Sequence, residues 1–303
     1  MTFPPSPRLW LRGQPVGTHD GMAPSIMAII NRTPDSFFEG ARQFDDVTAL
    51  QAAETALAEG AQIVDIGGVR AGGGPIITVE EELRRVVPFV LRVRELFPEL
   101  LVSVDTWRAE VAREVAAAGA DLINDTWAGH DPDLVSVAAE NGIGIVCSHT
   151  GNMTPRTDPF RVTYPPTSHS LPGVVVDVLD TLRASAERAV QAGVDPRSVI
   201  IDPTHDFGKN TWHSLQLVRH THELASVGFP VLMALSRKDF VGETLDLPPH
   251  ERLEGTLAAT AIAAWQGGRV FRAHDVQATR RVLDMVAAMR GDIPPQRVTR
   301  AVR

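Results

Sequence analysis

Cysteine is almost absent from this sequence, since Cys147 is the only one among its 303 residues. A lone thiol cannot form a disulfide within the chain, and it cannot supply the several thiolates of a structural zinc site. A disulfide framework and a zinc–thiolate centre are therefore excluded. The cysteine content fits a reducing compartment, and we expect a cytoplasmic protein.

Positive charge and long apolar runs are also scarce. The formal net charge is −8 at pH 7, so the chain lacks the general attraction of a basic protein to nucleic acid or anionic membranes. No uninterrupted apolar run is long enough to span a bilayer, and the N-terminus has neither region of a signal peptide. The sequence predicts no nucleic-acid partner and no membrane contact.

The chain does contain a repeating unit, in which an amphipathic helix and a glycine precede a short apolar run. Glycine favours the left-handed conformation that ends many helices, and six predicted helices end at Gly60, Gly119, Gly142, Gly193, Gly228 and Gly267. Short apolar runs of this kind are typical of parallel strands buried on both faces. Eight such runs occur, at residues 26–31, 62–66, 100–105, 121–124, 143–147, 199–202, 229–235 and 269–273.

Eight strands alternating with helices over 303 residues fit an α/β fold of the (β/α)₈ TIM-barrel type. A doubly wound open sheet is the alternative, but no G-x-G-x-x-G turn or switch point supports it. We predict a single-domain barrel over residues 25–290, with an N-terminal extension at 1–24 and a C-terminal tail at 291–303. The Pro-, Thr- and Ser-rich segment 149–172 is unusually long for a loop and is expected to lie over the active site.

Polar residues gather where the predicted strands end, which is the functional end of such a barrel. They are Asn31, Asp65, Asp105, Asn124, Asp125, His149, Asp202, Ser236, Arg237, Lys238, Arg272 and His274. Asp65 and Asp125, with the neighbouring Thr106, are interpreted as structural, because a single buried aspartate is often a helix cap or an ion-pair partner. A purely structural interpretation does not suit the whole ring, since unpaired buried charges are costly.

This ring combines two kinds of chemistry. Asp105, Asn124, Asp202 and Lys238 offer the mixture of donors and acceptors that complements a heterocycle. Asn31, Arg272 and His274 suit an anion, held directly or through a metal ion. Magnesium prefers oxygen ligands and often binds together with substrate phosphates, so Asn31 is the candidate metal ligand.

Seven motifs, in unbroken order, resemble the signature of dihydropteroate synthase. They are IINRTPDSF at 29–37, DIGG at 65–68, SVDT at 103–106, IND at 123–125, DPTHDFGK at 202–209, LSRK at 235–238 and HDV at 274–276. The similarity runs from about residue 26 to about residue 289, which is nearly the whole chain.

The resemblance implies a pterin-binding barrel that joins 6-hydroxymethyl-7,8-dihydropterin pyrophosphate to p-aminobenzoate in folate biosynthesis. By position, Asp105, Asn124, Asp202 and Lys238 correspond to the pterin pocket, and Asn31, Arg272 and His274 correspond to the magnesium–pyrophosphate end. Phe37, Phe207 and Ser236 would lie near p-aminobenzoate. Lys238, Arg272 and His274 are the candidate catalytic residues, and Arg272 also counts among the substrate-binding residues. The resemblance further implies a homodimer, a Mg²⁺ cofactor and sulfonamide ligands.

The sequence departs from the family at a glycine-rich segment, residues 69–75. The family typically reads ESTRPG after DIGG, whereas this chain reads VRAGGG. The family's Thr falls on Ala71 and its Arg on Gly72, so two side chains that help to close the site are missing. The family's Pro is Gly73 here, and each change of this kind raises the entropic cost of ordering the segment by about 0.4–1 kcal/mol. Whether Arg70 replaces the missing Arg is left open.

Two further departures lie in other loops. Arg32 and Phe38 replace smaller residues, and Thr204-His205-Asp206 replaces a Gly-x-Gly pattern, which adds bulk and a charge beside the pterin pocket. We therefore predict a divergent paralogue that keeps the pterin residues but has weak or no synthase activity. The alternatives are an active synthase with a rearranged loop, a non-catalytic pterin-binding or regulatory protein, and a methyltetrahydrofolate-binding methyltransferase domain. The last is disfavoured because the chain has no cobalamin domain.

Overall fold

A computed structural model of the chain describes residues 3–33, 46–157, 162–166 and 170–300. Eight strands form one parallel sheet: β3 (Ser25–Asn31), β4 (Ile63–Gly67), β5 (Leu101–Asp105), β6 (Leu122–Asp125), β7 (Gly144–Ser148), β8 (Val199–Asp202), β9 (Leu232–Met233) and β10 (Val270–Ala273). Neighbours follow the order β8-β7-β6-β5-β4-β3-β10-β9. A parallel bridge between Ile201 and Val231 joins the two ends, so the sheet closes. The predicted barrel is confirmed.

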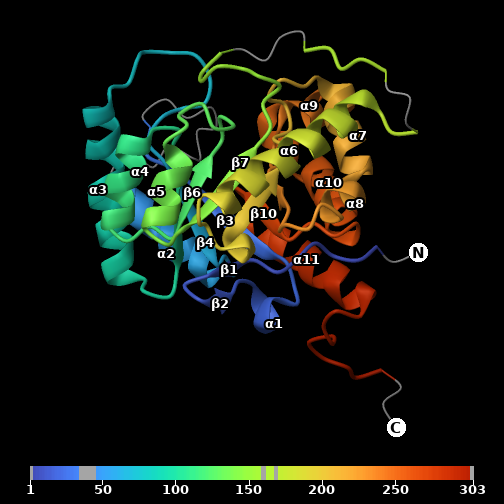
Figure 1. The fold of residues 1–303 in the computed structure, drawn as a ribbon. Coiled ribbons are helices and arrows are strands. Elements are labelled where there is room, and N and C mark those ends of the chain that lie inside the picture. The colour runs from blue at the N-terminus through green and yellow to red at the C-terminus, as the bar shows by residue number, and fades with distance from the viewer. Residues whose placement is uncertain (1–2, 34–45, 158–161, 167–169, 301–303) are drawn as a thin grey trace.

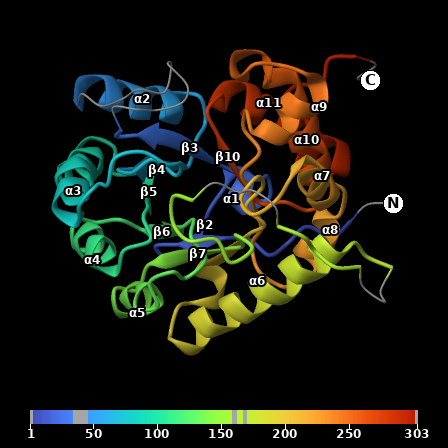
Figure 2. The same cartoon turned by 90° about the horizontal axis from the view of Figure 1, so that it is seen from above.

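Helices surround the sheet, as the view down the barrel shows (Figure 2). They are α2 (Asp46–Ala58), α3 (Val79–Leu96), α4 (Ala109–Ala117), α5 (Leu134–Glu140), α6 (Gly173–Gln191), α7 (Thr211–Arg219), α8 (Thr221–Ala225), α9 (Asp239–Leu245), α10 (Leu253–Trp265) and α11 (Val276–Arg290). Short 3₁₀ helices span Pro196–Ser198 and Pro249–Glu251. Within the described part of the chain, no helix combines the length and apolar character needed to cross a bilayer.

Local sequence signals explain several helix ends. All six glycines predicted to end helices have positive φ, between 63° and 109°, a region that other residues enter with strain. Thr78 begins α3 by accepting a hydrogen bond from the Glu81 amide at 3.2 Å. The Glu81 carboxylate pairs with Arg84 and Arg85.

Strand β9 is shorter than the predicted run 229–235. Pro230 has no amide hydrogen to donate to a neighbouring strand, although its carbonyl accepts a hydrogen bond from the Ile201 amide at 2.9 Å. The chain turns soon after Met233, and Arg237 has a positive φ of 55°. The prediction was too long because apolar character alone does not mark where pairing stops.

The N-terminal end of the barrel is filled by apolar side chains. Hairpin β1 (Trp10–Leu11) and β2 (Gln14–Pro15) lies beneath the strands, followed by α1 (Thr18–Gly21) (Figure 1). Its residues form one buried cluster with the inward side chains of the barrel: Leu9, Leu11, Val16, Met27, Ile63, Leu122, Val146, Ile200, Leu232 and Val270. This floor fills the interior of the barrel at its N-terminal end. Division of the chain at residues 24 and 290 remains a prediction.

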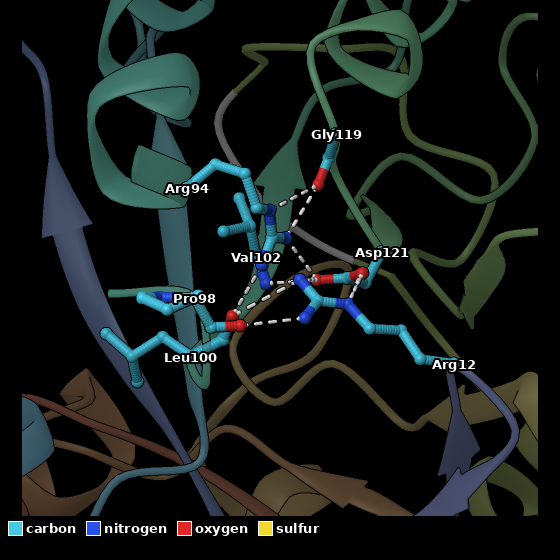
Figure 3. Close-up of polar contacts among 7 residues, drawn as sticks. All are labelled: Arg12, Arg94, Pro98, Leu100, Val102, Gly119 and Asp121. Atoms are coloured by element: carbon cyan, nitrogen blue, oxygen red, sulfur yellow. Dashed lines mark hydrogen bonds and ion pairs between the residues drawn. The ribbon is translucent and has the colours of Figure 1, made fainter. Parts of the chain in front are cut away.

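A polar network fixes the hairpin to the barrel (Figure 3). Arg12, in the hairpin turn, donates to the Asp121 carboxylate at 2.5 and 3.1 Å. Arg94 of α3 pairs with the same carboxylate at 2.5 Å, and the Val102 amide donates to it at 2.7 Å. Arg12 also donates to the Pro98 carbonyl at 2.9 Å. One carboxylate therefore ties the hairpin, α3 and β5 together.

Candidate functional site

The inner wall of the barrel changes from apolar to polar toward the carboxyl ends of the strands. Side chains alternate across a strand, so Ile63 and Asp65 of β4 face the same side, as do Leu122 and Asn124 of β6. Above the apolar floor lies a polar layer of Asp65, Ser103, Asn124 and Arg272. Its members are joined by the hydrogen bonds and ion pair described next.

Asp65 is the centre of this polar layer and is fully buried. It accepts from the Ser103 hydroxyl at 2.7 Å, the Asn124 amide at 3.1 Å and Arg272 Nε at 2.6 Å. The interpretation of Asp65 as an ion-pair partner is confirmed. Three bonds around one carboxylate also fix the orientation of Asn124 and Arg272, so this aspartate positions two candidate site residues.

Asp105 lies at the end of β5, beside the same guanidinium. Its carboxylate is 3.5 Å from Arg272 Nη2 and accepts from the Thr126 hydroxyl at 3.0 Å. Burial and the nearby charge of Asp65 raise the pKa of Asp105 to about 7, against the opposing effect of Arg272. In its ionised form this carboxylate can accept hydrogen bonds from the ring N–H donors of a heterocycle.

Asp202 and Lys238 lie on neighbouring strand ends. Burial raises the pKa of Asp202, and Lys238, Lys209 and Arg272 oppose that shift, so three cations lie within its electrostatic range. Lys238 Nζ donates to the His205 carbonyl and is 4.8 Å from the centre of the Phe207 ring. Burial lowers the pKa of Lys238. The cation therefore lies over the Phe207 ring, which also makes a T-shaped contact with Trp127 at 5.4 Å between ring centres.

Ser236 and His274 form a separate pair at the ends of β9 and β10. The Ser236 hydroxyl lies 2.9 Å from His274 Nδ1, and the His274 amide donates to the same hydroxyl at 3.2 Å. Burial and nearby Arg272 lower the pKa of His274 to about 4. His274 is therefore neutral at pH 7, so it can offer a hydrogen bond to an anion but no charge.

Asn31 ends β3 next to the site. Its Oδ1 is 3.5 Å from where a Cβ at Gly67 would stand, and Asp105 Cβ is 4.0 Å from the same point. Within the described ranges, no group of three or more His, Cys, Asp or Glu side chains could hold a metal ion. One amide oxygen fits a Mg²⁺ whose other ligands are phosphate oxygens and water. Phe37 and Phe38 lie outside the described residues.

The loop after β8 adopts a glycine-like backbone with larger residues. Thr204 and Asp206 both have positive φ, at 49° and 69°, which costs about 1–2 kcal/mol for a residue with a Cβ. The Asp206 carboxylate accepts from the Asp239 amide at 2.7 Å at the start of α9. His205 is fully buried beside Phe240. The added charge is therefore directed at a helix N-terminus, where it is stabilised.

Three further residues shape this mouth: His149, which the sequence indicated at a strand end, Lys209, which closes the motif at 202–209, and Ser148, which no motif indicated. Lys209 donates to the carbonyls of His149, Thr204 and Phe207 at 2.8, 3.2 and 2.9 Å, so it joins two strand ends. Burial lowers its pKa to about 7. His149 pairs with Asp177 at 2.7 Å. The buried Ser148 hydroxyl has no hydrogen-bond partner among the described residues. Inward alternation along β7 could have indicated Ser148.

Arg32 and Arg237 are held away from the mouth. The Arg32 guanidinium lies 4.7 Å over the Phe89 ring and pairs with Asp46. Arg237 pairs with Asp275 at 2.8 Å. Asp125 accepts from the Trp127 and Gly129 amides at 3.1 and 2.6 Å, which confirms its structural interpretation.

A closed parallel barrel with an apolar floor and an ionisable mouth defines a (β/α)₈ protein whose candidate site lies at the carboxyl ends of the strands. The chain belongs to the family of pterin-binding enzymes, because the family model described as "Pterin binding enzyme" matches residues 27–274. It is a divergent homologue of dihydropteroate synthase, so the family resemblance of the seven motifs is confirmed.

Similar proteins fall into two groups. A Mycobacterium leprae protein named inactive dihydropteroate synthase 2 is 57% identical, over 96% of this chain and 98% of that protein. The dihydropteroate synthase of Bacillus subtilis is 38% identical, over 87% of this chain and 88% of that enzyme. A crystal structure of Yersinia pestis dihydropteroate synthase with a sulfonamide drug is 35% identical, with a TM-score of 0.84, and covers 94% of this chain and 99% of that chain.

Proposed function

We propose that this chain binds pterins in the barrel mouth and has weak or no dihydropteroate synthase activity. The carrying observation is the arrangement of Asp65, Arg272, Asp105 and Asn124. These residues form a connected polar wall, whereas the adjoining glycine-rich segment has Ala71 and Gly72 where the family has Thr and Arg. The wall supports recognition of a heterocycle, and the segment lacks side chains that would complete catalysis.

Pterin recognition follows from the donors and acceptors on the wall. Ionised Asp105 and Asp202 accept hydrogen bonds from the amino and ring N–H groups of a pterin. Asn124 donates or accepts, and Lys238 donates to a ring carbonyl. The Phe207 ring and Ser236 would line the neighbouring space for p-aminobenzoate. Burial strengthens each of these bonds, because the competing water is excluded.

Catalysis requires more than recognition. Breaking the C–O bond to pyrophosphate is easiest where cations hold the leaving anion. Here Arg272 lies between two carboxylates, and the lowered pKa of His274, about 4, leaves that ring neutral. The cation that the family places at position 72 is missing. Loss of one charge-assisted contact costs roughly 1.5–3 kcal/mol, or one to two powers of ten in rate.

Further features are proposed on the same basis. Mg²⁺ would bind Asn31 when pyrophosphate supplies the remaining oxygens, and it would neutralise charge on the leaving group. Sulfonamides would bind weakly beside Phe207 and Ser236, since they mimic p-aminobenzoate. The protein would act as a cytoplasmic homodimer. An active synthase is the second candidate, and retention of Asp105, Asn124, Asp202 and Lys238 favours it.

Calorimetric titration with 6-hydroxymethylpterin tests the proposed binding. Asp202→Asn should weaken binding about tenfold or more, because a buried charged acceptor is lost. Asp180→Asn, an exposed change on α6, is the matched control and should bind as the unmodified protein does. Failure of the chain to rescue a synthase-deficient strain would support the catalytic half. No pterin binding, or robust rescue, would contradict the proposal.

A further inference from the structure

The glycine-rich segment contacts another loop of the barrel mouth. It follows β4, and the segment that carries Arg156 follows β7, so both leave the carboxyl end of the sheet (Figure 1). Strands β5 and β6 lie between them in the sheet order. A contact between the two loops therefore passes over the strand ends that carry Asp105 and Asn124.

Arg156 makes this contact with its guanidinium. Nη1 donates to the Pro75 carbonyl at 2.6 Å, and Nε donates to the Gly72 carbonyl at 3.3 Å. A Cβ placed on Gly74 would stand 3.2 Å from Nη2, and Gly74 has a φ of 145°. Gly74 therefore permits both the backbone conformation and the close approach of the cation. Arg156 therefore gives the glycine-rich segment hydrogen bonds that the segment's own side chains do not supply.

The backbone of Arg156 is strained in the orientation that makes the contact possible. Thr154, Pro155, Arg156 and Thr157 form a turn, in which the Thr157 amide donates to the Thr154 carbonyl at 3.3 Å. Arg156 has a φ of 64° at the third position, where such turns favour glycine. Because arginine is strained at a position that suits glycine, its presence there indicates a function for its side chain.

We infer that Arg156 is a positioning residue, which holds the glycine-rich segment across the barrel mouth and slows release of a bound pterin. We call the two bonds from Arg156 to the Gly72 and Pro75 carbonyls the strap. The strap orders a segment that lacks the family's Thr, Arg and Pro. It acts through two backbone carbonyls, and at position 74 it requires a residue without a Cβ. The part about release rests on the proposed pterin site, whereas the strap itself does not.

Native-state proteolysis measures the strap without any ligand. Thermolysin cuts before large apolar residues. Ile77 is such a residue, and Ile76 directly before it is 89% exposed, so cleavage of the 76–77 bond reports opening of this segment. Arg156→Ala keeps the turn strain and removes the guanidinium, whereas Arg156→Gly removes both. Both variants should be cut about tenfold faster or more, since each lost charge-assisted bond changes the opening equilibrium by about that factor.

The control is Arg113→Ala, an exposed change on α4, which should be cut at the unmodified rate. Arg156→Lys should be intermediate, because a single ammonium cannot reproduce the fork of a guanidinium. Faster cutting in Arg156→Ala alone would assign the effect to the turn and overturn the strap. Unchanged cutting in both variants would overturn it as well.

Stopped-flow release of 6-hydroxymethylpterin tests the second part. Arg156→Gly should release the pterin about tenfold faster, with the urea midpoint of unfolding unchanged. Unchanged release together with faster proteolysis would overturn the role at the site while the strap stands. Absence of pterin binding in the unmodified protein would count against the proposed function and leave the proteolysis result intact.

Discussion

Arg272 Nε lies 2.6 Å from the buried carboxylate of Asp65, and its Nη2 lies 3.5 Å from that of Asp105. One guanidinium therefore serves two carboxylates that repel each other. Burial and the charge of Asp65 raise the pKa of Asp105, and Arg272 opposes this rise from the longer distance. This unequal sharing places a titrating acid at the mouth of the barrel.

Replacing Asp65 by Asn should lower the pKa of Asp105 from about 7 toward its usual range. The substitution removes the repelling charge and leaves Arg272 with Asp105 as its remaining carboxylate. Carbon-13 NMR titration of the Asp105 carboxyl measures this shift. Asp133→Asn, at an exposed position before α5, serves as the control. An unchanged Asp105 titration in Asp65→Asn would rule out the shared-cation account.

Pterin affinity should depend on pH through Asp105. With a pKa of about 7, the carboxyl loses its charge as pH falls from 8 to 6, and the affinity should drop by up to about tenfold per pH unit below 7. The free energy of unfolding changes in the opposite direction. Between about pH 4 and 7 the native state binds a proton at Asp105 that the unfolded state does not, so the stability from this proton is lost as pH rises. Calorimetry from pH 6 to 8 measures binding, and Asp105→Asn should flatten the profile. A steep profile that survives in this variant would assign the titration to another group.

Arg12→Ala should destabilise the fold by about 1–3 kcal/mol, since it removes charge-assisted bonds to Asp121 and a bond to Pro98. The hairpin that seals the barrel floor is tied to β5 and α3 through this network. Urea unfolding at pH 7 measures the loss. Arg92→Ala, whose ion pair with Glu95 is exposed, should change stability by less than about 1 kcal/mol. Equal effects of the two substitutions would show that the network adds nothing to the free energy of unfolding.

The barrel could be predicted from the sequence because each helix, glycine and strand leaves a local signal. The predicted strand ends also grouped Asp105, Asn124, Asp202 and Arg272 at one end of the barrel, where they lie in the structure. Asp65 was interpreted only as a helix cap or an ion-pair partner, because its bonds to Ser103, Asn124 and Arg272 join strands that are distant in the sequence.

Contacts between loops could not be predicted for the same reason. The bonds from Arg156 to Gly72 and Pro75 cross 84 and 81 positions of sequence, and no periodic pattern reports such a pairing. The charge of Asp206 was expected beside the pterin pocket and does act on Lys238, but the sequence did not show that its carboxylate accepts from the first amide of α9. Side-chain direction in an irregular loop follows from backbone geometry that composition does not specify.

The most direct test of the account is the steady-state rate of dihydropteroate formation by the purified protein with both substrates and Mg²⁺. We predict a kcat/KM far below that of an active synthase measured alongside it, such as the Bacillus subtilis enzyme. The Ala71→Thr, Gly72→Arg variant should gain about ten- to a hundredfold, because a charge-assisted contact to the leaving anion is restored. A kcat/KM equal to that of the active enzyme in the unmodified protein would contradict the account, and Arg70 would then be the residue to replace.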